Sequence, residues 1–209
     1  MTKTAKTLVL AAVFLAGAAG FACAVDVSMH ALGRKCGLPD TNQTVCYDGD
    51  GGTIVCPAPG GDLAQDGSYA KASSSPSYTS QTIGVDVVTI DNRTGLMWAA
   101  NGNATGCNSG DTLISTMALA YCEGLAFANY SDWRLPNIRE LASIVDYSRQ
   151  NPSINTTYFP NTKNSFYWSS TTYVPNPGVA WYVYFSYGGV NNSTKTSNGY
   201  YVRCVRGGP

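Results

Sequence analysis

Apolar and polar positions divide the second half of the chain into strands and helices. The stretches "VDVVTI" and "LMWA" flank the turn sequence "DNRTG" and predict a pair of strands between residues 85 and 99. Residues 116–127 have the apolar spacing of a helix, with Thr116 as its N-cap. A second helix is predicted over residues 137–146, because Asn137 and Glu140 fit a capping box. The apolar stripe of this helix consists of Ile138, Leu141, Ile144 and Val145.

Strand patterns return after the second helix, in "SFYWSST", "VAWYVYFSY" and, beyond a Gly-Gly turn, "GYYVRCVR". The helices are therefore grouped together and do not alternate with the strands. This order predicts an α+β fold with two helices, a small antiparallel sheet and long loops.

The stretch from Trp181 to Tyr201 is crowded with Tyr, Asn, Ser and Thr. Alternation predicts that Trp181, Val183 and Phe185 face the core and that Tyr182, Tyr184 and Ser186 face outward. Tyrosine gives a large contact area at a small cost in rotamer entropy, and small polar residues give adaptable hydrogen bonds. An ordinary exposed hairpin is the alternative, since Tyr and Thr also favour strands. The predicted ligand-binding residues are Tyr173, Tyr182, Tyr184, Tyr187, Asn191, Asn192 and Tyr200.

The string "DWRLPNIREL" precedes and enters the second helix, and we interpret it as structural. Trp133 is predicted to lie in the core. Arg134 is predicted to form an ion pair with a carboxylate of the adjacent helix.

The N-terminus has the features of an export signal. Lys3 and Lys6 precede the apolar run "LVLAAVFLAGAAG" and an A-x-A site that ends at Ala24, which predicts a signal peptide over residues 1–24. Lipidation at Cys23 is the alternative, but Gly20 stands where a large aliphatic residue is usual. We expect an exported chain, secreted or on the cell surface, with a periplasmic or lipoprotein location as further options. No later segment is long enough to span a bilayer.

The mature chain divides into two parts. Residues 25–82 predict a cysteine-containing module followed by a Pro/Gly/Ser-rich linker from residue 57, and residues 83–209 predict the ligand-binding domain. Removal of the signal takes away Lys3 and Lys6 and lowers the formal charge from 0 to −2. This balance argues against nucleic acid or an anionic membrane as the main partner, although a local basic patch remains able to bind acidic glycans.

Six cysteines remain after signal cleavage, and an even number in an exported chain predicts three disulfides. Fifteen pairings are possible for six cysteines. The turn sequence "YDGDGGTIV" lies between two of them and predicts one bridge across a hairpin, and a second would join the first helix to the last strand. The predicted pairs are Cys46–Cys56, Cys122–Cys204 and, by elimination, Cys36–Cys107.

Residues for catalysis or for a metal are sparse. His30 is the only histidine, there is no CxxC pair, and "DGDGG" lacks the rest of an EF-hand loop. Nothing marks a tuned pair among the carboxylates, which include Glu123, Asp132, Glu140 and Asp146. We expect no enzymatic activity, no metal and no cofactor.

Several strings occur in the order seen in the Lcl C-terminal domain-like family, named for a collagen-like bacterial adhesin. They are "TGLMWA", "AYCEGL", "DWRLPNIREL", "YWSSTTY", "AWYVYF" and "YVRCVR", and the resemblance covers about residues 83–206. It implies a C-type-lectin-like fold in which the first and last strands of the domain pair. It also implies export, and the named adhesin binds sulfated glycosaminoglycans.

The Tyr/Asn-rich stretch, this resemblance and a likeness of the terminal "YVRCVR" to the formylglycine-generating family lead to three functional hypotheses. The first is an exported, non-enzymatic adhesin or receptor-binding protein whose partner is a protein or glycan on another cell or surface. Members of this family include proteins diversified by retroelements, which spread positions to Asn, Tyr, Ser and Thr, and this C-terminal stretch has that composition. The alternatives are a structural subunit of a surface assembly, with a possible homo-oligomer, and an enzyme similar to the formylglycine-generating family, which shares the lectin-like fold.

Overall fold

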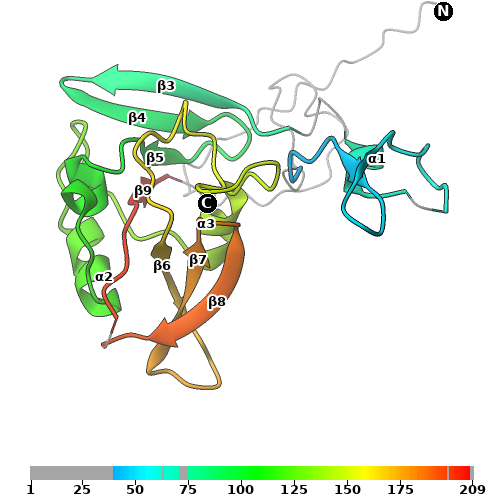
Figure 1. Cartoon of the computed structure of the whole chain (residues 1–209). Helices are drawn as coiled ribbons and strands as arrows, with labels where there is room; N and C mark the ends of the chain where they lie inside the picture. The colour runs from blue at the N-terminus through cyan, green and yellow to red at the C-terminus, as the bar shows by residue number, and fades with distance from the viewer. Residues whose placement is uncertain (1–39, 63, 71–74, 197, 208–209) are drawn as a thin grey trace, which may run out of the picture.

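The structure is a computed structural model that describes residues 40–62, 64–70, 75–196 and 198–207 (Figure 1). The predicted signal, His30 and Cys36 lie outside these residues. The helical segments are α1 (Asp66–Tyr69), the 3-10 helix η2 (Thr105–Gly110), α2 (Ser115–Glu123) and α3 (Ile138–Ser143). The strands are β1 (Cys46–Tyr47), β2 (Thr53–Ile54), β3 (Tyr78–Ile83), β4 (Asp86–Asp91), β5 (Met97–Ala99), β6 (Phe166–Thr172), β7 (Val179–Tyr184), β8 (Gly189–Thr194) and β9 (Val205–Arg206).

Within the described residues the strands form three antiparallel sheets, ordered β1-β2, β3-β4-β5-β9 and β6-β7-β8. The predicted α+β class is confirmed, with few helices and small antiparallel sheets. The predicted strand pair around "DNRTG" corresponds to β4 and β5. The last strand, β9, pairs with β5 through Met97↔Arg206 and Trp98↔Val205. The resemblance implied a pairing with the first strand, whereas β9 joins the second strand of the "DNRTG" pair.

Strand β3 lies in a stretch that the sequence predicted as linker. Residues Tyr78 to Ile83 pair in unbroken register with β4, around a two-residue turn at Gly84 and Val85. Gly84 has φ +65°, a conformation that glycine adopts without a steric cost. The main sheet therefore begins before residue 83.

The two predicted helices are present with different bounds. Helix α2 begins at Ser115 with Ile114 as its N-cap, so the assignment of Thr116 as N-cap was wrong. Helix α3 begins after Asn137, whose side chain accepts hydrogen bonds from the amides of Arg139 and Glu140, as the capping box predicted. It ends at Ser143, and Ile144 of the predicted stripe follows the helix but is still buried.

The "DWRLPNIREL" string joins α3 to the C-terminal strand. Arg134 Nη1 and Nη2 donate to the two carboxylate oxygens of Glu140, each at 2.7 Å, which confirms the predicted ion pair. Glu140 also accepts a hydrogen bond from the amide of Asn137 at 2.8 Å, so one carboxylate holds both the helix cap and the arginine. The backbone of Arg134 exchanges hydrogen bonds with Val205 of β9. This segment therefore fixes the outer edge of β9.

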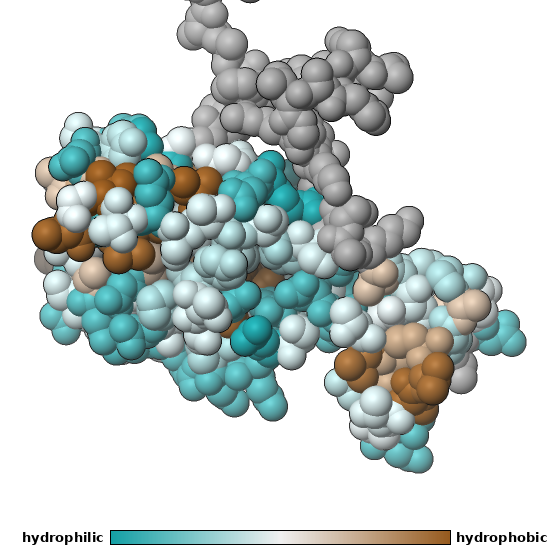
Figure 2. Space-filling model, turned by 90° about the horizontal axis from the view of Figure 1, so that it is seen from above, coloured by the Kyte–Doolittle hydropathy of each residue, from teal (hydrophilic) through white to brown (hydrophobic). Residues whose placement is uncertain are grey.

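The N-terminal module forms a lobe beside the main domain (Figure 2). Its Cys46–Cys56 disulfide is present, as predicted, and closes the β1-β2 hairpin. The Gly/Asp segment of that hairpin is a turn, in which Asp48 Oδ1 accepts from the amides of Asp50 and Gly52. The lobe contacts the segment after α3, where the Tyr147 amide donates to the Thr41 carbonyl at 3.0 Å.

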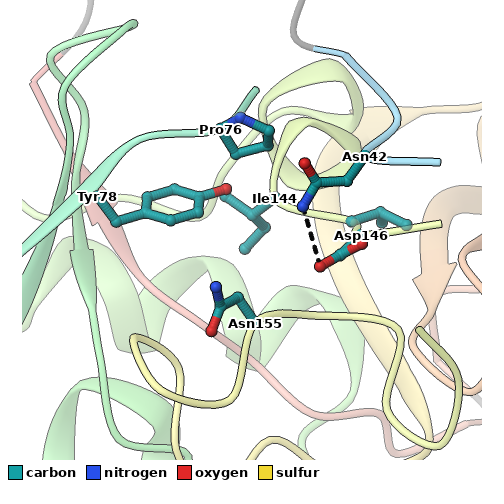
Figure 3. A pocket seen from close by; sticks show the side chains of 7 residues that line it. Asn42, Pro76, Tyr78, Ile144, Asp146 and Asn155 are labelled. Atoms are coloured by element: carbon teal, nitrogen blue, oxygen red, sulfur yellow. Dashed lines mark hydrogen bonds between the residues drawn. The ribbon is translucent and has the colours of Figure 1, made fainter. Parts of the chain in front are cut away.

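A small pocket lies between the lobe and the main domain (Figure 3). Asn42 Nδ2 donates to Asp146 Oδ2 at 3.3 Å on one side, and Tyr78, Pro76 and Asn155 line the rest. Asp146 is almost fully buried and accepts further hydrogen bonds from Ser148 and Arg149. The polar groups of Asp146 are therefore used to join segments of the chain, and the pocket is not the candidate functional site.

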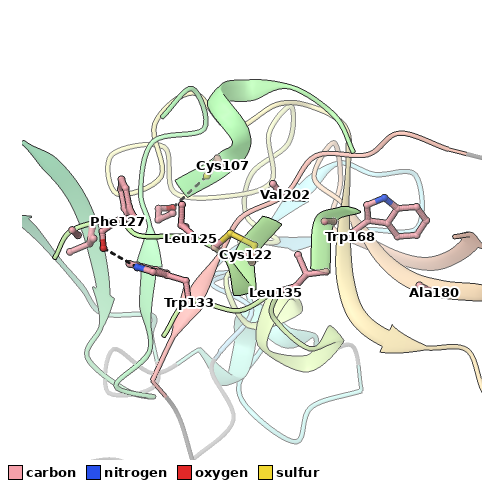
Figure 4. Close-up of a cluster of buried hydrophobic side chains, with 14 residues drawn as sticks. Cys107, Cys122, Leu125, Phe127, Trp133, Leu135, Trp168, Ala180 and Val202 are labelled. Atoms are coloured by element: carbon pink, nitrogen blue, oxygen red, sulfur yellow. Dashed lines mark hydrogen bonds between the residues drawn. A yellow bond between two sulfur atoms is a disulfide. The ribbon is translucent and has the colours of Figure 1, made fainter. Parts of the chain in front are cut away.

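Two clusters of buried apolar residues form the core of the main domain. The first surrounds the Cys122–Cys204 disulfide, which joins α2 to the C-terminal segment as predicted (Figure 4). Trp133 lies in this cluster, fully buried, and its Nε1 donates to the Phe127 carbonyl at 2.9 Å, which confirms its core position. The second cluster contains Leu141, Val183 and Phe185 and lies between α3 and the β6-β7-β8 sheet.

Cys107 corrects the predicted third disulfide. Its thiol is free and buried in the first core cluster, where Sγ lies 3.9 Å from the Ala99 carbonyl oxygen. The Cys36–Cys107 pairing is therefore absent, and the prediction that every cysteine of the mature chain is oxidised was wrong. Elimination failed because it assumed that an even number of cysteines must all pair.

Candidate functional site

One face of the β6-β7-β8 sheet carries a group of neighbouring aromatic side chains that we call the aromatic platform. Register places Phe166 opposite Tyr184 and Trp168 opposite Tyr182, so these four residues project to the same side. The members that reach the surface are Phe166, Tyr182, Tyr184, Tyr187 and Tyr200.

The rings of the platform contact one another, with Phe166 at the centre. Phe166 stacks on Tyr184 with centroids 4.3 Å apart, and it contacts Tyr182 at 5.0 Å and Tyr200 at 4.9 Å. Tyr182 and Tyr200 meet edge to face at 5.1 Å. The separations of 4.9 to 5.1 Å lie in the favourable range for aromatic pairs, and the Phe166–Tyr184 stack is slightly closer. Each ring is thus positioned by its neighbours before any ligand arrives.

Trp168 anchors the platform to the core. It is fully buried, its ring lies 4.5 Å from that of Tyr200, and its Nε1 donates to the Leu113 carbonyl at 2.9 Å. Leu113 and Tyr200 also exchange backbone hydrogen bonds. The segment before α2 therefore holds Tyr200 against the sheet.

Tyr187 extends the platform beyond the end of β7. Its ring meets that of Tyr184 at 5.0 Å, and 64% of its surface is exposed. A Cβ atom at Gly189 would lie 2.4 Å from the Tyr187 ring. A side chain at residue 189 would therefore displace this exposed ring from its observed position.

Small polar residues border the platform on β8. Asn191 lies opposite Tyr182 in the register and Ser193 lies opposite Ala180, which places both on the platform side. Ser193 Oγ accepts from Asn198 Nδ2 at 2.7 Å. The face thus combines one exposed ring and several half-buried rings with amides and hydroxyls, the composition found in antibody binding surfaces.

The platform has no formal charge at neutral pH. Burial raises the pKa of the Tyr182 hydroxyl, and neighbouring Tyr200 and Tyr187 raise it further, so this residue stays neutral. An uncharged aromatic surface binds through contact area and hydrogen bonds and exerts no long-range electrostatic attraction.

The structure brings together five of the seven predicted ligand-binding residues: Tyr182, Tyr184, Tyr187, Asn191 and Tyr200. Tyr173 and Asn192 lie on the opposite face. Asn192 pairs with Trp181, and the Tyr173 ring packs edge-on against Trp181 at 5.4 Å. Sequence reasoning missed Phe166, although its apolar alternation with Trp168 was visible in "SFYWSST".

The predicted alternation of β7 needs two corrections. Val183 and Phe185 are buried as predicted, but Trp181 is only half-buried. Tyr182 was predicted to face solvent, yet it is half-buried and packs against the first core cluster. Both sides of the strand contact core residues, because the sheet lies between the two clusters. A two-sided strand does not follow a simple inside–outside alternation.

The part of the chain that the structure describes holds no group of three or more His, Cys, Asp and Glu residues that could hold a metal ion. The free thiol of Cys107 is buried, and burial raises its pKa, an effect that the nearby Arg203 guanidinium opposes more weakly. A buried thiol with a raised pKa is a poor nucleophile. Among the described residues, no helix is both long and apolar enough to cross a membrane.

Comparison with known proteins finds one family. The model described as the Lcl C-terminal domain matches residues 87–206, from the second residue of β4 to the end of β9. The matched region contains the entire aromatic platform. No curated protein matches the chain.

Proposed function

The chain belongs to the Lcl C-terminal domain family, and from that premise we propose that it is an exported, non-enzymatic ligand-binding protein of the adhesin or receptor-binding type. Its binding surface would be the aromatic platform with the polar residues of β8. Its partner would be a protein or glycan on another cell or surface.

The observation that carries this proposal is the exposure of a pre-arranged aromatic surface. Tyr184 and Tyr187 project from the sheet and are held by ring contacts, and Tyr187 is largely exposed. Exposed aromatic groups of this kind are typical of interaction sites, since tyrosine is enriched among the residues that dominate binding energy.

The uncharged character of the platform bears on the class of ligand. Sulfated glycans are bound mainly through Lys and Arg, whereas the platform offers rings, amides and hydroxyls. This composition favours a neutral glycan or a protein surface. A heparin arm in the binding assay separates these classes, because binding of a sulfated chain should weaken steeply with salt while platform binding should not.

A glycan and protein array tests the proposal. The wild-type mature protein should bind a defined ligand, and the double variant Tyr184→Ala/Tyr187→Ala should lose at least tenfold in affinity. The matched control is Tyr173→Ala, which removes a tyrosine from the opposite face and should leave binding unchanged. Equal binding by the wild type and the double variant would refute the platform as the site. Dissociation of a native oligomer by the double variant would instead favour the structural-subunit alternative.

Diversification by a retroelement is a related proposal with a genomic test. Tyr187 and Asn191 are exposed, so substitutions there would leave the core intact. Val183 and Phe185 are buried, so substitutions there would disturb it. A near-copy of the coding segment should lie close to the gene and differ from it only where the copy has adenine. The differences should fall in codons whose residues are exposed on the protein surface. Absence of such a copy would remove this proposal and leave the binding surface unaffected.

A further inference from the structure

Strand β3 forms an open edge of the main sheet. It is the terminal strand in the order β3-β4-β5-β9 and pairs only with β4. The Asn92 amide donates a hydrogen bond to the Ser77 carbonyl, so this is a hydrogen-bonded pair. Hydrogen-bonded and non-hydrogen-bonded residue pairs alternate from there along β3 and β4. By that alternation, Thr79 and Gln81 bond to β4, while Tyr78, Ser80 and Thr82 direct their N–H and C=O groups away from it.

Two other sheet edges, those of β9 and β8, carry hydrogen-bond partners. Beyond β9, the backbone of Arg134 exchanges two hydrogen bonds with Val205. On β8, the outward amide of Asn192 is occupied by the side chain of Asn191 at 2.8 Å. No comparable partner is present for the β3 edge among the residues that the structure describes.

The sequence of β3 contains none of the features that protect an edge strand. Proteins usually protect such edges with charged side chains, proline or a bulge. The strand "YTSQTI" has no charge and no proline, and its register with β4 is continuous. The four central residues, Thr79 to Thr82, are exposed, so neither face is covered along the centre of the strand, while Tyr78 and Ile83 at its ends pack against the core.

The surroundings of β3 fit a partner strand. In Figure 1 the β3-β4 hairpin lies along one side of the molecule, away from the β6-β7-β8 sheet. Viewed from above, the surface over the hairpin is mainly polar, with apolar side chains toward the end where it turns (Figure 2). Val85 in that turn is 94% exposed and Val87 is also exposed.

We propose that β3 is a dimerisation edge, at which two copies of this chain pair antiparallel through their β3 strands. The occupant is a second copy because an uncharged strand can pair with itself without placing like charges opposite one another. The outward residues fix the register, with Ser80 opposite Ser80 of the second copy on the twofold axis and Tyr78 opposite Thr82. The two four-stranded sheets then become one continuous sheet.

The expected dimer is weak. One strand pair with the adjoining valines buries less area than the roughly 1,600 Å² of a standard stable interface. Self-association should therefore depend on protein concentration. This inference concerns a different sheet from the aromatic platform and does not rest on the proposed function.

Sedimentation analysis of the mature protein over a range of concentrations tests the dimer. The wild type should shift from monomer to dimer as concentration rises. Ser80→Lys places two lysines opposite each other on the axis and should leave a monomer with an unchanged melting temperature. The matched control, Ser170→Lys, adds the same charge at an exposed position of β6 and should still dimerise. A wild type that stays monomeric throughout, or a dimer that survives Ser80→Lys, would overturn the proposal.

A covalent cross-link checks the register. Opposed residues of a hydrogen-bonded antiparallel pair have Cα atoms about 5.5 Å apart, within the range of about 4.4–6.8 Å that a disulfide spans. Ser80→Cys should thus form a disulfide-linked dimer under mild oxidation, and Ser170→Cys should not. Equal cross-linking of the two variants would contradict pairing at β3.

Discussion

Phe166 stacks on Tyr184 with ring centroids 4.3 Å apart and an interplanar angle of 27°. The two residues are direct partners in the β6-β7 register, so the backbone pairing itself places one ring over the other. The stack fixes the orientation of Tyr184, and Tyr184 in turn supports Tyr187. A rigid aromatic group loses little conformational entropy when it binds, which is why this pair is well suited to recognition.

Tyr184→Ala and Tyr187→Ala should each weaken ligand binding by about 2 kcal/mol if these residues are binding hot spots. Tyr187→Ala should barely change the free energy of unfolding, because most of its side chain is exposed. Titration calorimetry with the array-identified ligand, paired with thermal unfolding, measures both effects. Loss of stability without loss of binding would show that Tyr187 supports the fold and does not contact the ligand.

Tyr182→Ala should destabilise the domain by about 1–3 kcal/mol, in contrast to Tyr187→Ala. Tyr182 is half-buried against the first core cluster and contacts Phe166 and Tyr200. Its removal exposes apolar surface and removes these ring contacts together with a third one to Trp168. Urea unfolding of the two variants gives the comparison. Equal stability of the two would mean that Tyr182 packs less tightly than its contacts indicate.

The sequence predicted the parts of the fold that depend on local chemistry. Asn137 and Glu140 form the expected capping box, and Arg134 finds the expected carboxylate. The pairing of Cys46 with Cys56 follows from a short turn. In each case the two partners are close in the chain or opposite in charge, so few other pairings are available to them.

The missed features depend on tertiary contacts. Strand β3 lacks an apolar alternation because its central side chains are exposed, so it could not be distinguished from a linker. Tyr173 and Asn192 were assigned to the binding face by composition, but the register of β7 with β8 puts Asn192 on the other side. The free thiol of Cys107 reflects where the chain buries it, which the number of cysteines does not determine.

Arg134→Ala should lower the free energy of unfolding by about 1.5–3 kcal/mol. The change removes two hydrogen bonds to Glu140 and one to the Gly207 carbonyl, and it leaves the mostly buried Glu140 carboxylate without its cation. Arg139→Ala, an exposed arginine on the same helix, is the matched control and should have little effect. Chemical denaturation measures both. Ligand binding by the folded Arg134→Ala protein should be unchanged, and a selective loss of binding would instead place Arg134 in the site.

Cys107 should resist thiol reagents in the folded protein and react once the chain unfolds. Its thiol is buried and its pKa is raised, so both access and thiolate formation are disfavoured. Labelling before and after denaturation, followed by peptide mapping, should find modified Cys107 only in the unfolded sample, with Cys122–Cys204 still bridged. A mapped Cys36–Cys107 disulfide would refute the free thiol, and fast labelling of the native protein would reopen the enzyme alternative.

Asp132 should make the domain slightly sensitive to acid. Arg206 donates two hydrogen bonds to this carboxylate, at 2.7 and 3.0 Å, and thereby holds its pKa below the usual range. A carboxyl whose pKa is lower in the folded state stabilises that state at neutral pH. The contribution is lost as the pH falls through the folded pKa, below the ordinary value of about 3.9. Because 59% of the Asp132 side chain is exposed, solvent screening keeps the effect small. Asp132→Asn should therefore melt slightly below the wild type at neutral pH, and the difference should vanish in strong acid. A difference that grew as the pH fell would show that the ion pair is not its source.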